Sequence, residues 1–222
     1  MGNFTKNNHK CMIEIKDGLP LLHYQVDMLR KVGIDEIVIT MGYREDIIKD
    51  YINSNFKDVK VTFVNNPKYL NTNYIYSMYL ALDEFEDEIL ILHGDLYFEG
   101  DVLEDIINSE LSSVVVDSTL ELPEKDFKAM VIDNRVKKIA TYITGENCIA
   151  CQPLYKLRLD DWYMRKAALR KFCENGQVNV YAEEALNTVL DKIYLNPLDV
   201  KCKLCMEVDT LDDLALLKSK LM

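Results

Sequence analysis

Short apolar runs and amphipathic segments alternate along the first half of the chain. An apolar run of four to six residues is too short for a buried helix and is typical of a strand covered on both faces. The strands predicted in this way lie at 11–15, 37–41, 59–64 and 88–92. Apolar residues spaced three and four apart predict helices at 20–33, 44–56, 76–82 and 102–107. This order predicts an α/β protein with a mostly parallel sheet and right-handed crossovers.

The alternation of strands and helices stops after residue 111. Strand-like runs joined by short turns predict antiparallel or mixed pairing, at 112–116, 127–132, 136–142 and 148–155. The chain then continues with helices at 159–174 and 181–191, a strand at 201–208 and a helix at 211–221. Because no repeat, low-complexity segment or linker interrupts this order, we expect a single domain over 1–222.

The composition excludes some classes of partner. Hydrophobic residues make up 49% and charged residues 28%, as in an ordinary globular protein. A formal net charge of −11 and the lack of a basic stripe argue against a nucleic-acid partner. No apolar run reaches the length of a membrane span, and the amino-terminal residues lack the apolar core of a secretion signal. We therefore expect a cytoplasmic protein without a nucleic-acid or membrane partner.

The six cysteines include two pairs with metal-like spacing, Cys148 with Cys151 and Cys202 with Cys205. Both pairs fall in strand-like runs, where residues three apart point to opposite faces and do not chelate one ion together. Neither pair is followed by the glycine that a zinc knuckle uses for its turn. We expect reduced, buried cysteines rather than a structural zinc site.

Two aspartates follow apolar strands, at the edge where α/β sheets bind ligands. Asp95 comes after the strand at 88–92, and Asp209 comes after the strand at 201–208. Carboxylates placed in this way can hold a magnesium ion that bridges phosphate oxygens. Each aspartate can instead cap the following helix, Asp209 with Asp212 as its capping partner. Taken alone, the pattern favours the cap, because caps at such junctions are frequent.

The order of these motifs resembles the nucleotidyltransferases that join a nucleoside triphosphate to a phosphorylated small molecule and release pyrophosphate. The resemblance covers nearly the whole chain, and its motifs are specific only jointly. The matching segments are Thr5 with His9-Lys10, 21–33, 37–43, 71–77, Gly94-Asp95 and 207–209. Within this family the chain is most similar to the phosphocholine cytidylyltransferase branch, through the Asn-Thr-Asn-Tyr-Ile-Tyr-Ser run at 71–77 and the Asn-Val-Tyr-Ala-Glu run at 179–183.

The resemblance implies a fold and a set of residue roles. The fold is Rossmann-like, three-layer α/β/α, with a nucleotide-binding half at 1–110, a small antiparallel acceptor-binding part at 111–200 and a closing strand and helix at 201–222. Lys10 matches the lysine that contacts the triphosphate, and Asp95 and Asp209 match the aspartates that bind Mg²⁺. The segment that contacts the base or ribose matches Asn71, Asn73 and Ser77. Since nucleotidyl transfer needs positioning and charge neutralisation more than a nucleophile, the histidines need no catalytic role.

A choline head group is a quaternary ammonium, which aromatic faces and a carboxylate bind together. Tyr181 with Glu183 or Glu184 has this chemistry, although the same residues also fit a helix with a core tyrosine and solvated glutamates. The further candidates for acceptor binding are Tyr97, Tyr155, Trp162 and, for the acceptor phosphate, Lys128.

The sequence departs from the family at its amino-terminal end. The first strand of the family ends in Leu-Ala-Ala-Gly and leads into a glycine-rich loop with an arginine, whose backbone N–H groups cradle the triphosphate. The sequence opens inside this signature and retains its last part through Lys10. We therefore expect two open strand edges and an incomplete phosphate site. A late start of the sequence, a partner or rearrangement that fills the gap, and a non-catalytic relative are the three explanations, of which the intact later positions favour the first.

The resemblance thus predicts a magnesium-dependent cytidylyltransferase that makes CDP-choline, or a close analogue, from CTP and phosphocholine. Aminoethylphosphonate or a sugar 1-phosphate is the alternative acceptor. A nucleotide-binding module that has lost catalysis is the alternative from another class of protein. A homodimer is compatible with the sequence.

Overall fold

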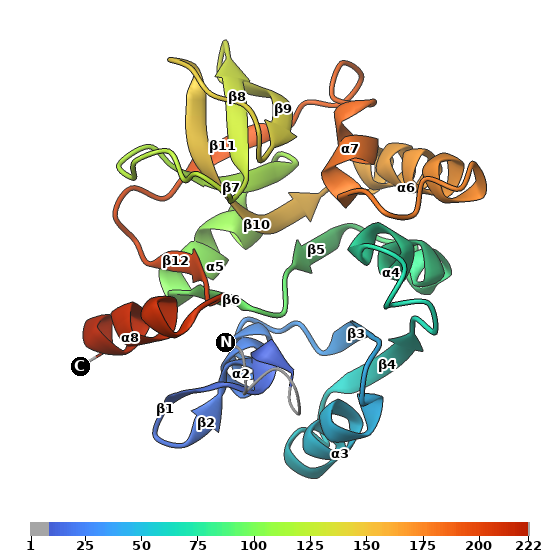
Figure 1. The fold of residues 1–222 in the computed structure, drawn as a ribbon, viewed down its shortest axis with the longest axis vertical. Coiled ribbons are helices and arrows are strands. Elements are labelled where there is room, and N and C mark those ends of the chain that lie inside the picture. The colour runs from blue at the N-terminus through green and yellow to red at the C-terminus, as the bar shows by residue number, and fades with distance from the viewer. Residues whose placement is uncertain (1–8, 222) are drawn as a thin grey trace.

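The computed structural model describes residues 9–221 and has an α/β architecture (Figure 1). The strands are β1 (Glu14–Lys16), β2 (Leu19–Pro20), β3 (Glu36–Met41), β4 (Lys60–Asn65), β5 (Ile89–Leu92), β6 (Leu96–Phe98), β7 (Ser113–Asp117), β8 (Lys128–Ile132), β9 (Arg135–Ala140), β10 (Cys148–Leu157), β11 (Asn196–Asp199) and β12 (Cys205–Glu207). The helices are α2 (Leu21–Lys31), α3 (Glu45–Asn55), α4 (Tyr74–Leu80), α5 (Gly100–Asn108), α6 (Leu159–Glu174), α7 (Ala182–Asn187) and α8 (Leu211–Lys220), with 3-10 turns η1 (Lys10–Met12) and η2 (Leu82–Glu84).

The largest sheet has six strands and is mixed. β10 lies between β5 and β7 and runs antiparallel to both, and its first residues also pair antiparallel with β8. β7 and β11 pair in parallel, and β3 and β4 form a separate parallel sheet. The prediction of a mixed sheet is confirmed. The prediction that it is mostly parallel is wrong, because β10 returns antiparallel between strands of the two halves.

β3 and β5 each keep one open edge. Within residues 9–221, β3 pairs with β4 alone and β5 pairs with β10 alone. Both strands line one cavity of about 450 Å³.

The boundaries of several short elements differ from the predicted ones. The predicted strand at 11–15 is a 3-10 turn followed by the short strand β1, and the helix predicted at 181–191 ends at Asn187. β12 has three residues because Lys201 and Cys202, with φ of 40° and 65°, adopt left-handed turn conformations before it. The strands β2, β6 and β11 have two to four residues, too few for a recognisable pattern of hydrophobic positions.

The amphipathic helices bury the faces that their spacing predicts. Leu22, Val26 and Leu29 of α2 are 6%, 2% and 5% exposed, and Ile48 and Ile52 of α3 pack in the same cluster as Leu22 and Val26. These contacts attach α2 and α3 to the β3–β4 sheet.

The cysteines are all free thiols. Cys148 and Cys151 are buried on β10, and Cys205 is buried on β12. Cys202 is exposed, because it lies in the turn before β12 and not in a strand, so the expectation of burial is wrong for this residue. None of the helices within residues 9–221 is long and apolar enough to cross a bilayer.

Candidate functional site

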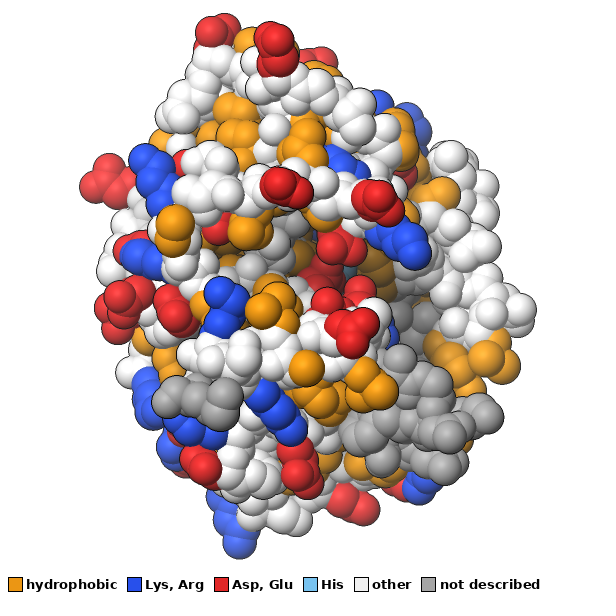
Figure 2. Space-filling model, turned by 60° about the vertical axis from the view of Figure 1, so that its left-hand side comes forward, with side chains coloured by type: hydrophobic (Ala, Val, Ile, Leu, Met, Phe, Trp, Pro, Cys, Tyr) orange, Lys and Arg blue, Asp and Glu red, His pale blue; other side chains and the backbone are white. Residues whose placement is uncertain are grey.

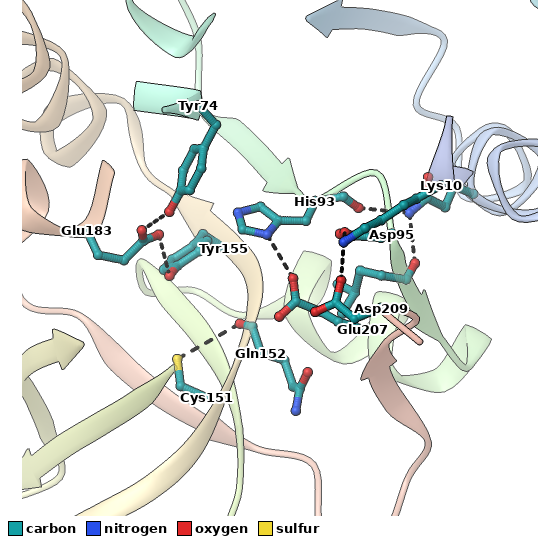
Figure 3. Close-up of polar contacts among 12 residues, drawn as sticks. Lys10, Tyr74, His93, Asp95, Cys151, Gln152, Tyr155, Glu183, Glu207 and Asp209 are labelled. Carbon is teal, nitrogen blue, oxygen red and sulfur yellow. Dashed lines mark hydrogen bonds and ion pairs between the residues drawn. The ribbon is translucent and has the colours of Figure 1, made fainter. Parts of the chain in front are cut away.

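Lys10 joins the two aspartates that the sequence singles out. Its Nζ atom lies 3.4 Å from Oδ2 of Asp95 and also donates to Oδ1 of Asp209 (Figure 3). Asp95 lies in the turn between β5 and β6, and Asp209 lies in the short segment between β12 and α8, one residue before the capping residue Thr210. The fold thus brings together three charged groups that are far apart along the chain.

Strand pairing positions the two aspartates. β6 and β12 run antiparallel, with Leu96 opposite Glu207. One residue further, the N–H of Val208 donates to the carbonyl of Asp95 over 2.8 Å. Because Asp95 and Asp209 flank this pairing, their side chains lie at the same end of the two strands.

Neither aspartate serves as the cap of a helix. Thr210 caps α8: its Oγ1 accepts from the N–H of Asp213 over 3.1 Å, and the Asp213 carboxylate accepts from the N–H of Thr210 over 2.7 Å. Glu99 occupies the capping position of α5. The alternative in which Asp209 caps with Asp212 is therefore wrong, and both aspartate side chains face the site instead.

His93 and Glu207 extend the cluster, and neither was predicted as a site residue. Nδ1 of His93 lies 2.9 Å from Oε1 of Glu207. One ligand atom from each of His93, Asp95 and Glu207 can be chosen so that all three lie within 4.8 Å of one another. Residues two apart in an extended segment project to the same side, so the spacing of Glu207 and Asp209 is the signal that could have identified Glu207.

The charges of the cluster stabilise positive groups. Burial by itself lowers the pKa of His93, but the hydrogen bond to Glu207 and the nearby carboxylates outweigh it and leave this pKa raised. Burial also lowers the pKa of Lys10, whereas its bonds to Asp209 and Asp95 raise it above the usual value. The Glu207 carboxyl has a raised pKa, chiefly because it is buried. The site therefore favours a bound cation.

The donor set fits a hard divalent cation. Carboxylate oxygens are the ligands that Mg²⁺ prefers, and Asp95 and Asp209 already share the ammonium group of Lys10. Glu207 adds a third carboxylate beside Asp95. Figure 2 shows a hollowed face of the molecule with acidic side chains inside the hollow and around it. A triphosphate placed against such carboxylates would be repelled unless a cation lies between them.

The residues predicted for the base or ribose lie on α4 and on the loop before it. The Oδ1 atom of Asn73 accepts the N–H of Tyr74 over 2.7 Å and so caps α4. The hydroxyl of Ser77 accepts from Nδ2 of Asn66 over 3.0 Å, and Asn71 is exposed. Asn66, which is 2% exposed, was not predicted, and it ties the loop to α4.

Glu183 of α7 connects this region to β10 and α6. It accepts hydrogen bonds from the hydroxyl of Tyr74 and, over 2.9 Å, from the hydroxyl of Tyr155 (Figure 3). Its Oε1 atom also lies 3.8 Å from Nη2 of Arg165, and the carboxylate is buried. The Tyr74 ring in turn stands edge-on to His93, with ring centroids 4.8 Å apart.

A second cavity, of about 460 Å³, lies on the other side of Glu183. Its lining combines aromatic and acidic side chains, including Phe127, Tyr142, Phe172, Tyr181, Glu183 and Glu184. Tyr181 is 43% exposed, and the centroid of its ring lies 5.2 Å from that of Phe127. The fold therefore brings the predicted Tyr181, Glu183 and Glu184 to one cavity.

The remaining predicted acceptor residues lie inside the protein. Tyr97 is buried and stacks on Tyr24 with ring centroids 4.8 Å apart. Trp162 is 2% exposed and lines the first cavity. Lys128 is also 2% exposed, and its Nζ atom donates to three backbone carbonyls, those of Glu124, Asp126 and Thr141.

Relatives of known activity match part of the chain. The CTP:phosphoglutamine cytidylyltransferase of Campylobacter jejuni is 31% identical over 143 residues, which are 61% of this chain and 55% of that protein. The choline-phosphate cytidylyltransferase of Streptococcus pneumoniae is 30% identical over 110 residues, which are 50% of this chain and 46% of that protein. The chain thus spans about half the length of these two curated relatives.

Solved structures match the fold over nearly the whole chain. The inositol-1-phosphate CTP transferase from T. maritima has a TM-score of 0.78 at 21% identity, covering 98% of this chain and 89% of that one. The CTP:phosphocholine cytidylyltransferase from Streptococcus pneumoniae also has a TM-score of 0.78, at 18% identity, covering 100% of this chain and 93% of that one. These similarities show a shared fold.

A family profile matches residues 6–193, and its description is "Domain of unknown function (DUF6564)". This match covers more than half of the chain. In sequence the chain is similar to the two curated cytidylyltransferases, and in fold it is similar to the two solved nucleotidyltransferase structures. The chain belongs to the DUF6564 family.

Proposed function

We propose that this site transfers a cytidylyl group from CTP to a small phosphorylated acceptor that carries a positively charged amine, with release of pyrophosphate. Phosphocholine represents this class of acceptor. The meeting of Lys10, Asp95 and Asp209 at one point is the observation that carries the proposal. An ammonium group and a pair of carboxylates are the groups that a metal–triphosphate complex needs.

CTP is favoured as the donor because both relatives described above are named as cytidylyltransferases. Their named acceptors differ, since one is phosphoglutamine and the other is choline phosphate. The relatives therefore support CTP as the donor, whereas the second cavity supports the class of acceptor.

The residues of the cluster have separate roles in binding and in charge neutralisation. Lys10 binds a phosphate oxygen of CTP and offsets the charge that develops on the departing pyrophosphate. Asp95 and Asp209 would hold Mg²⁺, which when bound neutralises charge on the triphosphate. An acceptor phosphate oxygen forms the new bond to the α-phosphorus while the bond to pyrophosphate breaks, so no nucleophilic side chain is required. The hydrogen bond from His93 holds Glu207 beside Asp95.

The second cavity suits a positively charged amine. A cation is attracted to the faces of aromatic rings and to nearby carboxylates, and Tyr181, Phe127 and Glu184 line this cavity. Glu183 lies in the wall that both cavities share. An acceptor with its amine in this cavity could therefore direct its phosphate toward the carboxylate cluster.

The reaction is tested by pyrophosphate release from CTP and phosphocholine in the presence of Mg²⁺. We expect release to require Mg²⁺ and to fall by at least about 100-fold in Asp95→Ala and Asp209→Asn. Asp212→Asn is the matched control, because Asp212 is an exposed carboxylate in the first turn of α8. Mg²⁺-dependent binding of CTP without turnover on any amine-bearing phosphate would contradict the proposal and indicate a non-catalytic nucleotide-binding module.

The acceptor class is tested with phosphocholine, aminoethylphosphonate and glucose 1-phosphate as competing acceptors. Tyr181→Ala and Glu184→Gln should raise KM for phosphocholine by about 3- to 30-fold, as expected for loss of a cation–π or charge contact. Tyr163→Ala, an exposed tyrosine on α6, is the control. Faster turnover of glucose 1-phosphate than of both amines would contradict the acceptor assignment while leaving nucleotidyl transfer in place.

A further inference from the structure

Three side chains present metal-ligating atoms close together beside Lys10. They are His93, Asp95 and Glu207, and one ligand atom of each can be chosen so that all three lie within 4.8 Å of one another. Nδ1 of His93 and Oε1 of Glu207 are 2.9 Å apart, and their side chains point toward each other (Figure 3). The set combines one nitrogen donor with two carboxylates, whereas the pair that Lys10 joins consists of carboxylates alone.

The separations suit ligands of a single metal ion. Bonds of about 2.1 Å to an octahedral ion place neighbouring ligand atoms about 3.0 Å apart and opposite ones about 4.2 Å apart. The distance of 2.9 Å from Nδ1 of His93 to Oε1 of Glu207 is that of neighbouring ligands. Since the third atom lies within 4.8 Å of both, a small rotation of the Asp95 side chain brings it to the same ion.

The backbone that carries these ligands is held by several elements. Gln25 of α2 is 3% exposed, and its Nε2 atom donates to the carbonyl of His93 over 2.9 Å and to that of Leu96 over 2.7 Å. The N–H of His93 donates to the carbonyl of Pro153 over 3.3 Å. Leu96 in turn pairs with Glu207 across β6 and β12. The ligands are therefore held in place before an ion binds, as a metal site requires.

A hydrogen bond between His93 and Glu207 does not by itself need a third residue. Here the turn after β5 carries both His93 and Asp95, and β12 brings Glu207 to them from far along the chain. An imidazole nitrogen is a common ligand of transition-metal ions, whereas Mg²⁺ takes oxygen ligands. A carboxylate has two oxygens, and the two ions of a shared site lie about 3.5–4 Å apart. Asp95 can thus serve both this set and the pair with Asp209.

We propose that His93, Asp95 and Glu207 form a second metal site, which binds a divalent first-row transition-metal ion such as Mn²⁺ or Co²⁺. The imidazole nitrogen selects such an ion over Mg²⁺. The ion takes the place of the hydrogen between Nδ1 of His93 and Oε1 of Glu207, and three protein ligands leave positions open for water or a phosphate oxygen. The inference rests on the proposed function for the role of this ion beside the triphosphate, and not for its binding.

The site is tested by titrating the whole chain with Co²⁺ in excess Mg²⁺, without nucleotide or acceptor. Excess Mg²⁺ occupies the carboxylate pair, and the visible absorption of Co²⁺ changes when a nitrogen atom replaces an oxygen ligand. We expect saturation at one Co²⁺ per chain. His93→Gln and Glu207→Gln should each weaken Co²⁺ binding by at least about tenfold, since even loss of a residue that only supports a ligand has an effect of this size.

Two controls make the test specific. His23→Gln removes an imidazole on α2 that bonds to Tyr51, and it should leave the Co²⁺ affinity unchanged. In His93→Gln, the Mg²⁺ affinity measured by calorimetry should stay within about threefold of the unsubstituted value, because Mg²⁺ takes oxygen ligands. This retained affinity also shows that the variant is folded.

Equal Co²⁺ affinities of His93→Gln and His23→Gln, or the absence of a saturable absorption change, would overturn the proposal. Absence of pyrophosphate release from a chain that binds Co²⁺ at this site would count against the proposed function alone.

Discussion

Tyr155 donates its hydroxyl to Oε1 of Glu183 over 2.9 Å, in the wall between the two cavities. Tyr74 donates to the other oxygen of the same carboxylate, and Nη2 of Arg165 lies 3.8 Å from it. Tyr155, Glu183 and Arg165 are each 1% exposed. A buried carboxylate with these partners holds α4, β10, α6 and α7 together.

Removal of the Glu183 carboxylate should destabilise the protein through Arg165. Glu183→Ala leaves the guanidinium buried without its counter-charge, which costs about 3–5 kcal/mol of unfolding free energy. Glu183→Gln keeps an acceptor for one tyrosine and should lose about 1–3 kcal/mol. Chemical denaturation measures both, and Glu184→Gln, in a half-buried neighbour, should stay within about 0.5 kcal/mol of the unsubstituted protein. Equal stability of Glu183→Ala and Glu184→Gln would contradict this account.

Asn66 should be essential for the shape of the loop before α4. Its Nδ2 atom donates to the hydroxyls of Thr72 and Ser77, each over 3.0 Å, and its Oδ1 accepts the N–H of Lys68 over 2.9 Å. Asn66→Ala removes all three bonds and should lower the unfolding free energy by about 1–3 kcal/mol. If the loop contacts the nucleotide, KM for CTP should rise as well. Asn55→Ala, at an exposed position that bonds only within α3, is the control for both measurements.

Many helices and strands could be predicted from the sequence because each depends on the pattern of residues within its own segment. The apolar stripe of α2 and the apolar run of β5 each depend on residues close in sequence, and both elements lie where the pattern predicts. Pairing between strands is not local. β10 pairs with β5 and β7 through residues more than 30 positions apart along the chain, and this antiparallel pairing is the reason that the mixed sheet is not mostly parallel as predicted.

In the candidate site, too, features that depend on nearby residues could be predicted, and features that depend on distant segments could not. Asp95 and Asp209 follow recognisable strands, so their place at a sheet edge is predictable. Lys128 is a predicted residue for the acceptor phosphate, but three carbonyls from two separate segments surround its Nζ atom. Tyr97 is a predicted aromatic residue for the acceptor, yet β6 is buried on both faces. A three-residue strand that is buried on both faces shows no alternation of hydrophobic and polar residues by which the sequence could reveal it.

Replacement of Lys10 should change metal binding and turnover in opposite directions. Lys10→Met removes the ammonium group that Asp95 and Asp209 share, so Mg²⁺ should bind the free protein more tightly in calorimetric titration. The same change removes a cation from the proposed triphosphate site and should lower kcat/KM for CTP by about 100- to 1000-fold. Lys31→Met, which removes only an exposed ion pair with Asp27, should alter neither quantity. Weaker Mg²⁺ binding in Lys10→Met would contradict the shared-cation geometry.

The thiols should separate into one fast and several slow groups in their reaction with a thiol reagent. Cys202 is exposed, whereas Cys173 is buried and burial raises its pKa to about 11. Since the thiolate is the reactive form, about one Cys173 in a thousand is reactive at pH 8, and its rate should rise about tenfold per pH unit up to that pKa. Burial, together with the charge of Asp95, raises the pKa of Cys11 to about 12, so this thiol should be slow as well. The absorbance change of a colorimetric thiol reagent should therefore show a fast phase of one thiol per chain at pH 8. Cys202→Ser should abolish this fast phase. A fast phase that persists in Cys202→Ser would show that one of the other thiols is accessible in the folded protein.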